Sequence, residues 1–188
     1  MIQPWPKLGT TALGDFKVFS LRKELKRSPR TGQPHEFFVL DAVDWVNIVA
    51  LTPDNQLVLV EQFRHGSETV ELEIPGGIMD AHDASPVATA VRELREETGY
   101  EGEHARVIGQ VFPNAAILSN RCYTVLVENC RLTHPVQFDH GEDIVTKLAP
   151  ADTIPGLIAA GKIRHCIVVA ALHYFELWRR GLVSEPVG

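Results

Sequence analysis

Residues 92–100 read RELREETGY, which places three carboxylates on little more than one helical turn before a glycine ends the helix. Glu93 and Glu97 are four residues apart and therefore lie on the same helical face, with Glu96 beside them. Like charges at this spacing destabilise an isolated helix by roughly 0.2–0.5 kcal/mol. A hard divalent cation such as Mg²⁺ or Mn²⁺, which prefers oxygen ligands, would offset that repulsion. The alternative is a solvated helix face on which Arg92 screens Glu96.

The residues before this turn predict a strand, a glycine loop and a helix. Residues 71–80 read ELEIPGGIMD, and an acidic loop then leads to Ser85 and Pro86, which suit an N-cap and a first helical position. Apolar residues recur at helical spacing beyond them. The adjacent Gly76 and Gly77 allow the backbone to approach a ligand closely and to aim a carbonyl at it. The segment is therefore expected to bring a carbonyl and several carboxylates toward one point.

This segment resembles the Nudix box, in which a glycine, five residues, a glutamate and seven residues precede Arg-Glu-apolar-x-Glu-Glu-x-Gly-apolar. Gly77 and all of residues 92–100 match that pattern. One extra residue separates Gly77 from Arg92, and the first glutamate of the box appears here as Asp83 or Asp80. A loop before a helix absorbs an extra residue easily. The departure therefore bears on the role of the first acidic position and not on the metal site.

The resemblance implies roles for the residues of the box. Glu93 and Glu97 are implied as direct metal ligands, together with the carbonyl of Gly76. Glu96 is implied as a further ligand or as a base that acts on metal-bound water. Arg92 is expected to orient these carboxylates through forked hydrogen bonds, the alternative being a plain helix ion pair. Such a site is expected to hold two or three Mg²⁺ ions, with Mn²⁺ as the alternative metal.

A second part of the resemblance concerns the substrate. Residues 60–64, VEQFR, look like the strand and arginine that precede the box in ADP-ribose and nucleotide-sugar pyrophosphatases. Arg64 is accordingly expected to contact a phosphate or a ribose, the alternative being an ion pair with Glu61 or Glu73. Glu73 matches an acidic residue before the box and is itself a candidate for substrate binding.

Two loops after the box helix supply further candidates. In the related pyrophosphatases a glutamate on a late acidic loop is often proposed as the general base, and the matching residue here is Glu142. The alternative for Glu142 is an ordinary solvated acid. Within residues 112–121, Pro113 fits the place of a family proline, whereas the acidic residue that often follows appears as Asn120. This exchange weakens the assignment to ADP-ribose and leaves other sugar nucleotides open.

The remaining pattern predicts a mixed α/β protein. Strands are expected over residues 16–25, 36–40, 45–51, 56–63, 105–112, 122–129 and 143–148, and helices over residues 86–98, 154–160 and 166–180. Such an order implies helices on both sides of a mixed sheet, and the resemblance implies the same α/β/α sandwich. Residues 1–14 are expected to be an irregular arm. We divide the chain into this arm with a β-hairpin (1–41) and a Nudix hydrolase domain (42–188).

Composition restricts the classes of protein that remain. The 188 residues are 45% apolar and carry a net charge of −6, which suits a single domain and argues against a nucleic-acid binder. Three cysteines without CxxC spacing, and the lack of a signal-peptide or membrane-spanning pattern, predict a cytoplasmic protein. Related pyrophosphatases form homodimers through an N-terminal sheet, so the apolar face of the hairpin is expected to be buried against a second copy.

The sequence therefore predicts a Mg²⁺-dependent Nudix hydrolase that cleaves a nucleoside diphosphate sugar, with ADP-ribose as the leading candidate. The expected products are a nucleoside monophosphate and a sugar phosphate. One alternative is a Nudix hydrolase of another nucleotide, either a dinucleotide or a modified nucleoside triphosphate. The other is a non-catalytic module that senses nucleotides.

Overall fold

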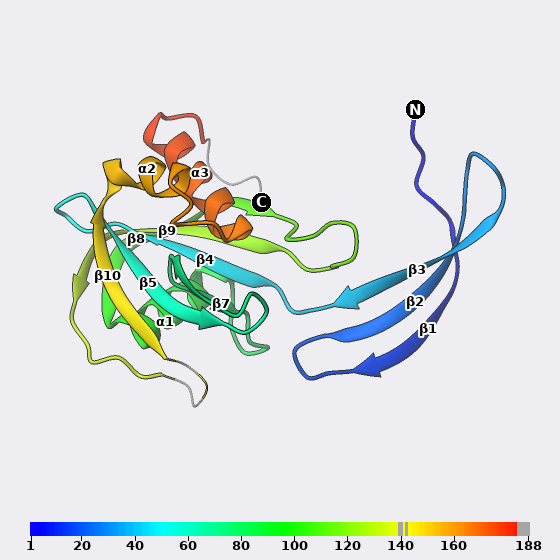
Figure 1. Ribbon diagram of the computed structural model, residues 1–188, viewed down its shortest axis with the longest axis horizontal. Helices are drawn as coiled ribbons and strands as arrows, with labels where there is room; N and C mark the ends of the chain where they lie inside the picture. Colours follow the sequence, from blue (N-terminus) through cyan, green and yellow to red (C-terminus); the bar gives the residue numbers. More distant parts are fainter. Residues whose placement is uncertain (139–140, 142, 184–188) are drawn as a thin grey trace. The chain divides into compact units, whose positions relative to one another are not determined.

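The computed structural model describes residues 1–138, 141 and 143–183 of the chain. The chain forms two compact units (Figure 1). The N-terminal unit consists of residues 1–43 and 112–121, and the main unit consists of residues 44–111 and 122–188. Among the described residues, no helix is both long and apolar enough to cross a membrane.

A three-stranded antiparallel sheet forms the N-terminal unit. Its strands, in the spatial order β1-β2-β3, are β1 (Lys7–Asp15), β2 (Ser20–Arg27) and β3 (Pro34–Asp41). The predicted hairpin is confirmed, but the prediction of an irregular arm was wrong from Lys7 onward. β1 pairs with β2 along its whole length, from Lys7 opposite Lys26 to Asp15 opposite Ser20. Lys7 Nζ also lies 2.6 Å from the carboxylate of the buried Glu24 of β2. Hydrogen bonds from Lys26 and Lys7 lower the pKa of Glu24 to about 2.

Residues 112–121 complete the N-terminal unit, although the sequence analysis placed them in the Nudix domain. The amide of Leu40 donates to the carbonyl of Ile117 at 2.8 Å, and the amide of Ser119 donates to the carbonyl of Leu40 at 3.1 Å. The side chain of Asn120 donates to the carbonyl of Val43 at 3.0 Å. These bonds attach the loop that contains Pro113 and Asn120 to the end of β3.

Two sheets and three α-helices form the main unit. One sheet is mixed, with the order β7-β4-β9-β8, and the other is antiparallel, with the order β10-β5-β6. The strands are β4 (Trp45–Ala50), β5 (Gln56–Arg64), β6 (Thr69–Glu73), β7 (Gly76–Ile78), β8 (Tyr100–Val111), β9 (Cys122–Leu132) and β10 (Ile144–Pro150). The helices are α1 (Pro86–Thr98), α2 (Ile154–Ala159) after the 3-10 turn η1 (Ala151–Thr153), and α3 (Cys166–Arg179).

Alternation along the strands divides the interior of the main unit into two cores. Val46, Ile48 and Ala50 of β4 pack in one core with Ala90 and Leu94 of α1. The intervening β4 residue Val49 packs in the other core, with Leu172 and Phe175 of α3. Successive side chains of a strand point to opposite faces, so α1 and α3 cover opposite faces of the mixed sheet (Figure 1). The predicted α/β/α arrangement with a mixed sheet is confirmed.

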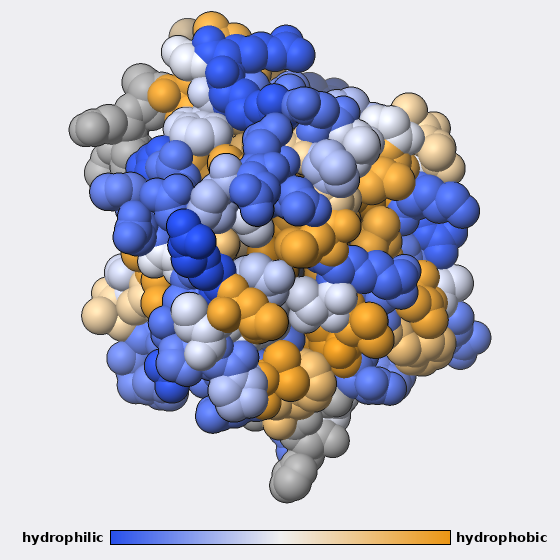
Figure 2. Space-filling view, turned by 90° about the vertical axis from the view of Figure 1, so that its left-hand side faces the viewer, coloured by the Kyte–Doolittle hydropathy of each residue, from blue (hydrophilic) through white to orange (hydrophobic). Residues whose placement is uncertain are grey.

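The edge strand β10 has a charged side chain that discourages pairing with another chain. Lys147 of β10 forms an ion pair with Glu61 of β5 at 2.6 Å, while Val145 and Leu148 are exposed. On the face shown in Figure 2, hydrophobic side chains are interspersed with hydrophilic ones. Charged side chains on edge strands discourage intermolecular strand pairing.

The box helix α1 has the ends that the sequence predicts. The side chain of Ser85 accepts a hydrogen bond from the amide of Ala88 at 3.2 Å, and Pro86 is the first helical residue. At the other end Gly99 adopts a left-handed conformation, with φ of 74°, and its amide donates to the carbonyl of Arg95. A Cβ on Gly99 would lie 2.2 Å from the carbonyl oxygen of His134.

Two glycine substitutions separate backbone strain from steric overlap. Gly161 has a φ of 66° and open space around its Cα, so G161A should cost only the strain of a left-handed residue, about 1–2 kcal/mol. G99A adds the overlap with His134 and should cost a further ~1–3 kcal/mol. Chemical denaturation of both variants measures this difference. Equal losses of unfolding free energy would contradict it.

Candidate active site

A glycine loop lies directly against the acidic face of α1. A Cβ on Gly77 would lie 2.3 Å from the carboxylate of Glu93, and a Cβ on Gly76 would lie 2.4 Å from the carbonyl oxygen of Val46. The amide of Gly76 donates to the carboxylate of Glu97 at 3.1 Å. Only glycine fits these two positions, which explains how β7 comes so close to the helix.

The guanidinium of Arg92 lies at the centre of the acidic cluster. Its NH1 lies 3.0 Å from both Glu93 Oε1 and Glu96 Oε2, and its NH2 lies 2.9 Å from Asp83 Oδ2. The bond to Asp83, together with the nearby negative charges, raises the pKa of Arg92. Arg92 thus holds Glu93 and Glu96 through NH1, while the bond from NH2 to Asp83 fixes the position of the guanidinium.

The carboxylate of Asp83 is held by several hydrogen bonds. Besides Arg92, its carboxylate accepts hydrogen bonds from the hydroxyl of Thr89 at 2.9 Å and from the amide of Asp80 at 3.0 Å. The bond from Arg92 lowers the pKa of Asp83 well below its usual range. The side chain of Asp80 is more exposed and lies 3.5 Å from Arg92 NH2. The extra residue of the loop is absorbed in a turn that folds Asp83 back onto the helix.

The donor set of the acidic cluster fits a hard divalent cation. Glu93 and Glu97 are buried, Glu96 is half-buried, and all their donors are carboxylate oxygens, which Mg²⁺ prefers. Their carboxylates are turned toward Arg92 and the amide of Gly76. Accordingly, in the described part of the chain, no group of three or more acidic, histidine or cysteine side chains is arranged as a metal site.

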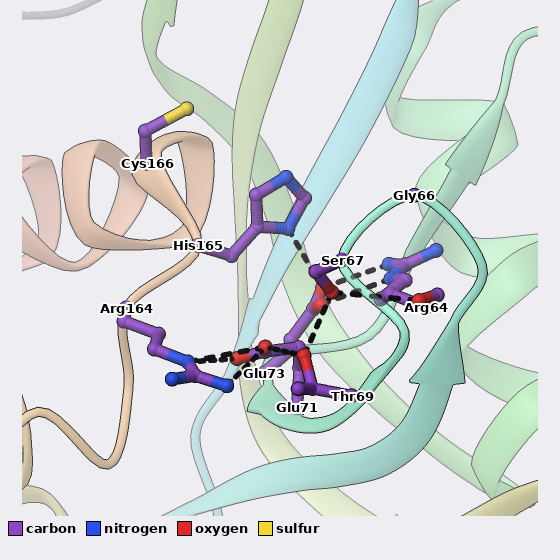
Figure 3. A pocket seen from close by; sticks show the side chains of 9 residues that line it. All are labelled: Arg64, Gly66, Ser67, Thr69, Glu71, Glu73, Arg164, His165 and Cys166. Carbon is purple, nitrogen blue, oxygen red and sulfur yellow. Dashed lines mark hydrogen bonds and ion pairs between the residues drawn. The ribbon is translucent and has the colours of Figure 1, made fainter.

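A pocket of about 690 Å³ is lined by two further predicted residues, Arg64 and Glu73 (Figure 3). Glu73 of β6 is buried and receives a forked pair of bonds from Arg64, with Nε–Oε1 at 2.9 Å and NH2–Oε2 at 2.7 Å. Nδ1 of His165 lies 3.0 Å from the same carboxylate. Burial raises the pKa of Glu73, but the bonds from Arg64 and His165 outweigh burial and lower the pKa to about 2.

A second ion pair lines the same pocket beside the first. Glu71, two residues before Glu73 on β6, accepts bonds from Arg164 Nε at 2.9 Å and NH2 at 2.8 Å. The hydroxyl of Thr69 also donates to Glu71. The bonds from Arg164 lower the pKa of Glu71 to about 2. Because strand residues two apart share a face, β6 presents both carboxylates to the pocket.

The structure thus brings together some of the predicted site residues and not others. Gly76, Arg92, Glu93, Glu96 and Glu97 meet at the glycine loop. Arg64 and Glu73 form the ion pair that the sequence analysis gave as the alternative for Arg64.

The remaining predicted residues, Pro113, Asn120 and Glu142, belong to neither of these two groups. Pro113 and Asn120 belong to the N-terminal unit, where Asn120 is buried and its Oδ1 has no hydrogen-bond partner among the described residues. Glu142 lies outside the described residues.

Sequence reasoning missed the residues at the start of α3. Arg164 and His165 line the pocket but match no part of the box. The available signal was a basic residue and a histidine directly before a long apolar helix. Asn47 was also missed, because a single asparagine within an apolar strand carries no motif. Its amide donates to the carbonyl of Ile167 at 2.9 Å, and in the sheet register it is the partner of Gly76.

Comparisons with known proteins agree with this geometry. Residues 18–162 match the model of the NUDIX domain. The chain is 31% identical over 154 residues to the ADP-sugar pyrophosphatase of Mus musculus, covering 78% of this chain and 70% of that protein. It is 25% identical over 133 residues to the ADP-ribose pyrophosphatase of Bacillus subtilis (strain 168), covering 70% and 71% respectively.

A solved structure supports the same assignment at the level of the fold. A crystal structure of an ADP compounds hydrolase superposes with a TM-score of 0.84 over 96% of this chain and 97% of that chain, at 19% identity. The family match covers most of the chain and contains the glycine loop, the acidic helix and the pocket strands β5 and β6. The chain therefore belongs to the Nudix domain family and is a Nudix hydrolase.

Proposed function

We propose that this protein hydrolyses the pyrophosphate bond of a nucleoside diphosphate sugar, with ADP-ribose as the first candidate. Oxygen from water forms a new bond to one phosphorus atom, and the bridging P–O bond breaks to leave a nucleoside monophosphate and a sugar phosphate. The observation that carries this proposal is the close approach of Gly76 and Gly77 to a helical turn with three glutamates. The names of the relatives from mouse and Bacillus subtilis support the substrate class.

The residues of the box suit a divalent metal, which we propose to be Mg²⁺, with Mn²⁺ as a substitute. Glu93, Glu96, Glu97 and the carbonyl of Gly76 would hold it. When bound, such an ion neutralises phosphate charge and lowers the pKa of a bound water. Arg92 orients Glu93 and Glu96 before any ion arrives, since its NH1 lies 3.0 Å from both.

The general base is proposed to be Glu142 or Glu96. Glu96 is supported by its place on α1, where it projects from the same turn as the proposed ligands. Glu142 is supported only by its match to a late acidic loop. Either carboxylate would accept a proton from the attacking water.

Substrate contacts are proposed for Arg64, Glu73, Pro113 and Asn120. Arg64 uses Nε and NH2 for Glu73, and its NH1 is proposed to contact a phosphate or ribose oxygen. The bonds to Glu73 raise the pKa of Arg64, so its guanidinium stays charged beside the pocket. A substrate or water donor to Asn120 Oδ1 would remove the cost of that buried acceptor, about 1–3 kcal/mol.

The substrate is tested with a panel of nucleotides in Mg²⁺, with alkaline phosphatase releasing phosphate from the products. ADP-ribose and other nucleoside diphosphate sugars should be cleaved faster than dinucleotides or oxidised nucleoside triphosphates. Preference for a dinucleotide or triphosphate would reassign the substrate within the family. Turnover of no nucleotide would favour a non-catalytic sensing module.

Glu97→Gln tests the proposed metal site. The variant keeps the shape of the side chain but loses its charge, so turnover should fall by at least about 10²-fold, on the scale of ~2.7–4 kcal/mol in the barrier. Direct Mn²⁺ binding, measured by electron paramagnetic resonance, should weaken in parallel. Glu103→Gln is the matched control, because Glu103 is an exposed residue of β8. A Glu97→Gln enzyme with the wild-type rate at saturating Mg²⁺ would exclude Glu97 as a ligand.

Glu142→Gln and Glu96→Gln, assayed side by side, identify the base. Loss of the base should lower kcat by roughly 10²- to 10⁴-fold with little change in KM, and it should remove the acidic limb of the pH–rate profile. A change in KM alone for Glu142→Gln would instead mark its loop as part of substrate binding. An unchanged acidic limb in both variants would exclude both residues.

We further propose that the protein acts as a homodimer through its N-terminal unit. That unit exposes large apolar side chains, both on its strands (Leu8, Leu13, Phe37 and Phe38) and in the β1–β2 connection (Phe16 and Val18). A second copy would remove them from water. Light scattering at micromolar concentration should give twice the 20.9 kDa mass of the chain. A monomer at that concentration would contradict this proposal.

A further inference from the structure

The start of α3 is fixed to the glycine loop through Asn47. The side-chain amide of Asn47 donates to the carbonyl of Ile167, in the first turn of α3, and the backbone of Asn47 pairs with Gly76. A Cβ on Gly76 would lie 3.1 Å from Asn47 Oδ1, so the two residues are packed tightly together. Arg164 and His165 therefore lie at a defined position relative to the box, although neither belongs to it.

Hydrogen bonding fixes the proton of His165. Glu73 is buried and already accepts the fork from Arg64, so it is ionised and acts only as an acceptor. Nδ1 of His165, at 3.0 Å from Glu73, must therefore carry its proton. In the neutral ring this leaves Nε2 as an acceptor, and Figure 3 shows that Nε2 points away from Glu73. The side chain of His165 is 34% exposed, so a ligand in the pocket can reach it.

The charges of the pocket favour an uncharged, hydroxylated ligand. The positive charges of Arg64 and Arg164 are matched by the negative charges of Glu73 and Glu71 through forked bonds. The lining thus has little excess charge with which to attract an anion. It offers guanidinium N–H groups, carboxylate oxygens and an imidazole acceptor, which are suited to sugar hydroxyl groups.

We propose that Arg164 and His165, with Glu71 and Glu73, form the subsite for the sugar of the sugar phosphate half of the substrate. In this subsite Nε2 of His165 accepts a hydrogen bond from a sugar hydroxyl. The inference rests on the proposed function, because that function supplies the sugar. It makes His165 a residue that determines specificity, and it assigns the nucleoside half to another part of the protein.

The two products of ADP-ribose hydrolysis test the subsite separately. Binding of ribose 5-phosphate and of AMP, each with Mg²⁺, is measured by calorimetry for the wild type, His165→Asn and His165→Gln. Asparagine places an amide where Nδ1 was and keeps the bond to Glu73, whereas glutamine places its amide where Nε2 was. His173→Asn is the matched control, because His173 is exposed on the same helix.

The inference predicts opposite effects of the two variants. His165→Asn should weaken ribose 5-phosphate binding roughly tenfold, the scale of a lost hydrogen bond, and should keep the melting temperature and the affinity for AMP. His165→Gln should keep most of the affinity for ribose 5-phosphate but lower the melting temperature, because Glu73 loses a partner. His173→Asn should change none of these values.

Two results would overturn the inference, and they differ in what they say about the enzyme. If ADP-ribose is hydrolysed but His165→Asn binds ribose 5-phosphate as tightly as the wild type, the subsite is wrong and the proposed function stands. An equal loss of AMP binding in His165→Asn has the same meaning. If the wild type neither hydrolyses ADP-ribose nor binds either product, the proposed function fails together with the subsite.

Discussion

The contact of Arg92 with Asp83, Glu93 and Glu96 is the interaction on which the rest of the site depends. Glu93 and Glu96 stand on one turn of α1, and Asp83 faces them from the preceding loop. Without a cation among them these groups would repel one another in a partly buried setting. The guanidinium supplies that charge, and Asp83 fixes its direction. With the helix face held in this way, Gly76 and Gly77 can lie against it and place a backbone segment beside acidic side chains.

Much of the fold can be predicted from local sequence patterns, namely helix-capping residues and apolar strands. The ends of α1 are set by local conformation: Ser85 caps the first turn, Pro86 is the first helical residue, and Gly99 ends the helix in a left-handed conformation. The nearly continuous apolar run of β4 is typical of a strand that is covered on both faces, as the two cores show. The strand β1 could not be predicted, because its glycines disfavour a strand and its pairing with β2, including the ion pair from Lys7 to Glu24, appears only in the folded sheet. Long-range ion pairs of this kind leave no periodic trace in a sequence.

The site residues also fall into those that local sequence predicts and those that only the folded chain brings together. The box residues could be predicted because one helix and one loop, adjacent in sequence, contain them all. Arg64 and Glu73 were found as individual candidates, but their mutual pairing depends on the register of β5 and β6. Arg164 and His165 lie about ninety residues from the glutamates that they contact, with |i−j| of 93 and 92. Only the folded chain shows that the start of α3 faces the same pocket.

Asn47 has a consequence for how such an enzyme can change. One side of this residue pairs with the glycine loop, and its amide holds the first turn of α3. A shift of α3 would therefore disturb the loop that lies against the acidic helix. Exchange of the side chains of Arg164 and His165, directly before α3, disturbs no such backbone contact. In the proposed subsite, replacement at positions 164 and 165 is therefore expected to change the substrate preference without moving α3 or the glycine loop.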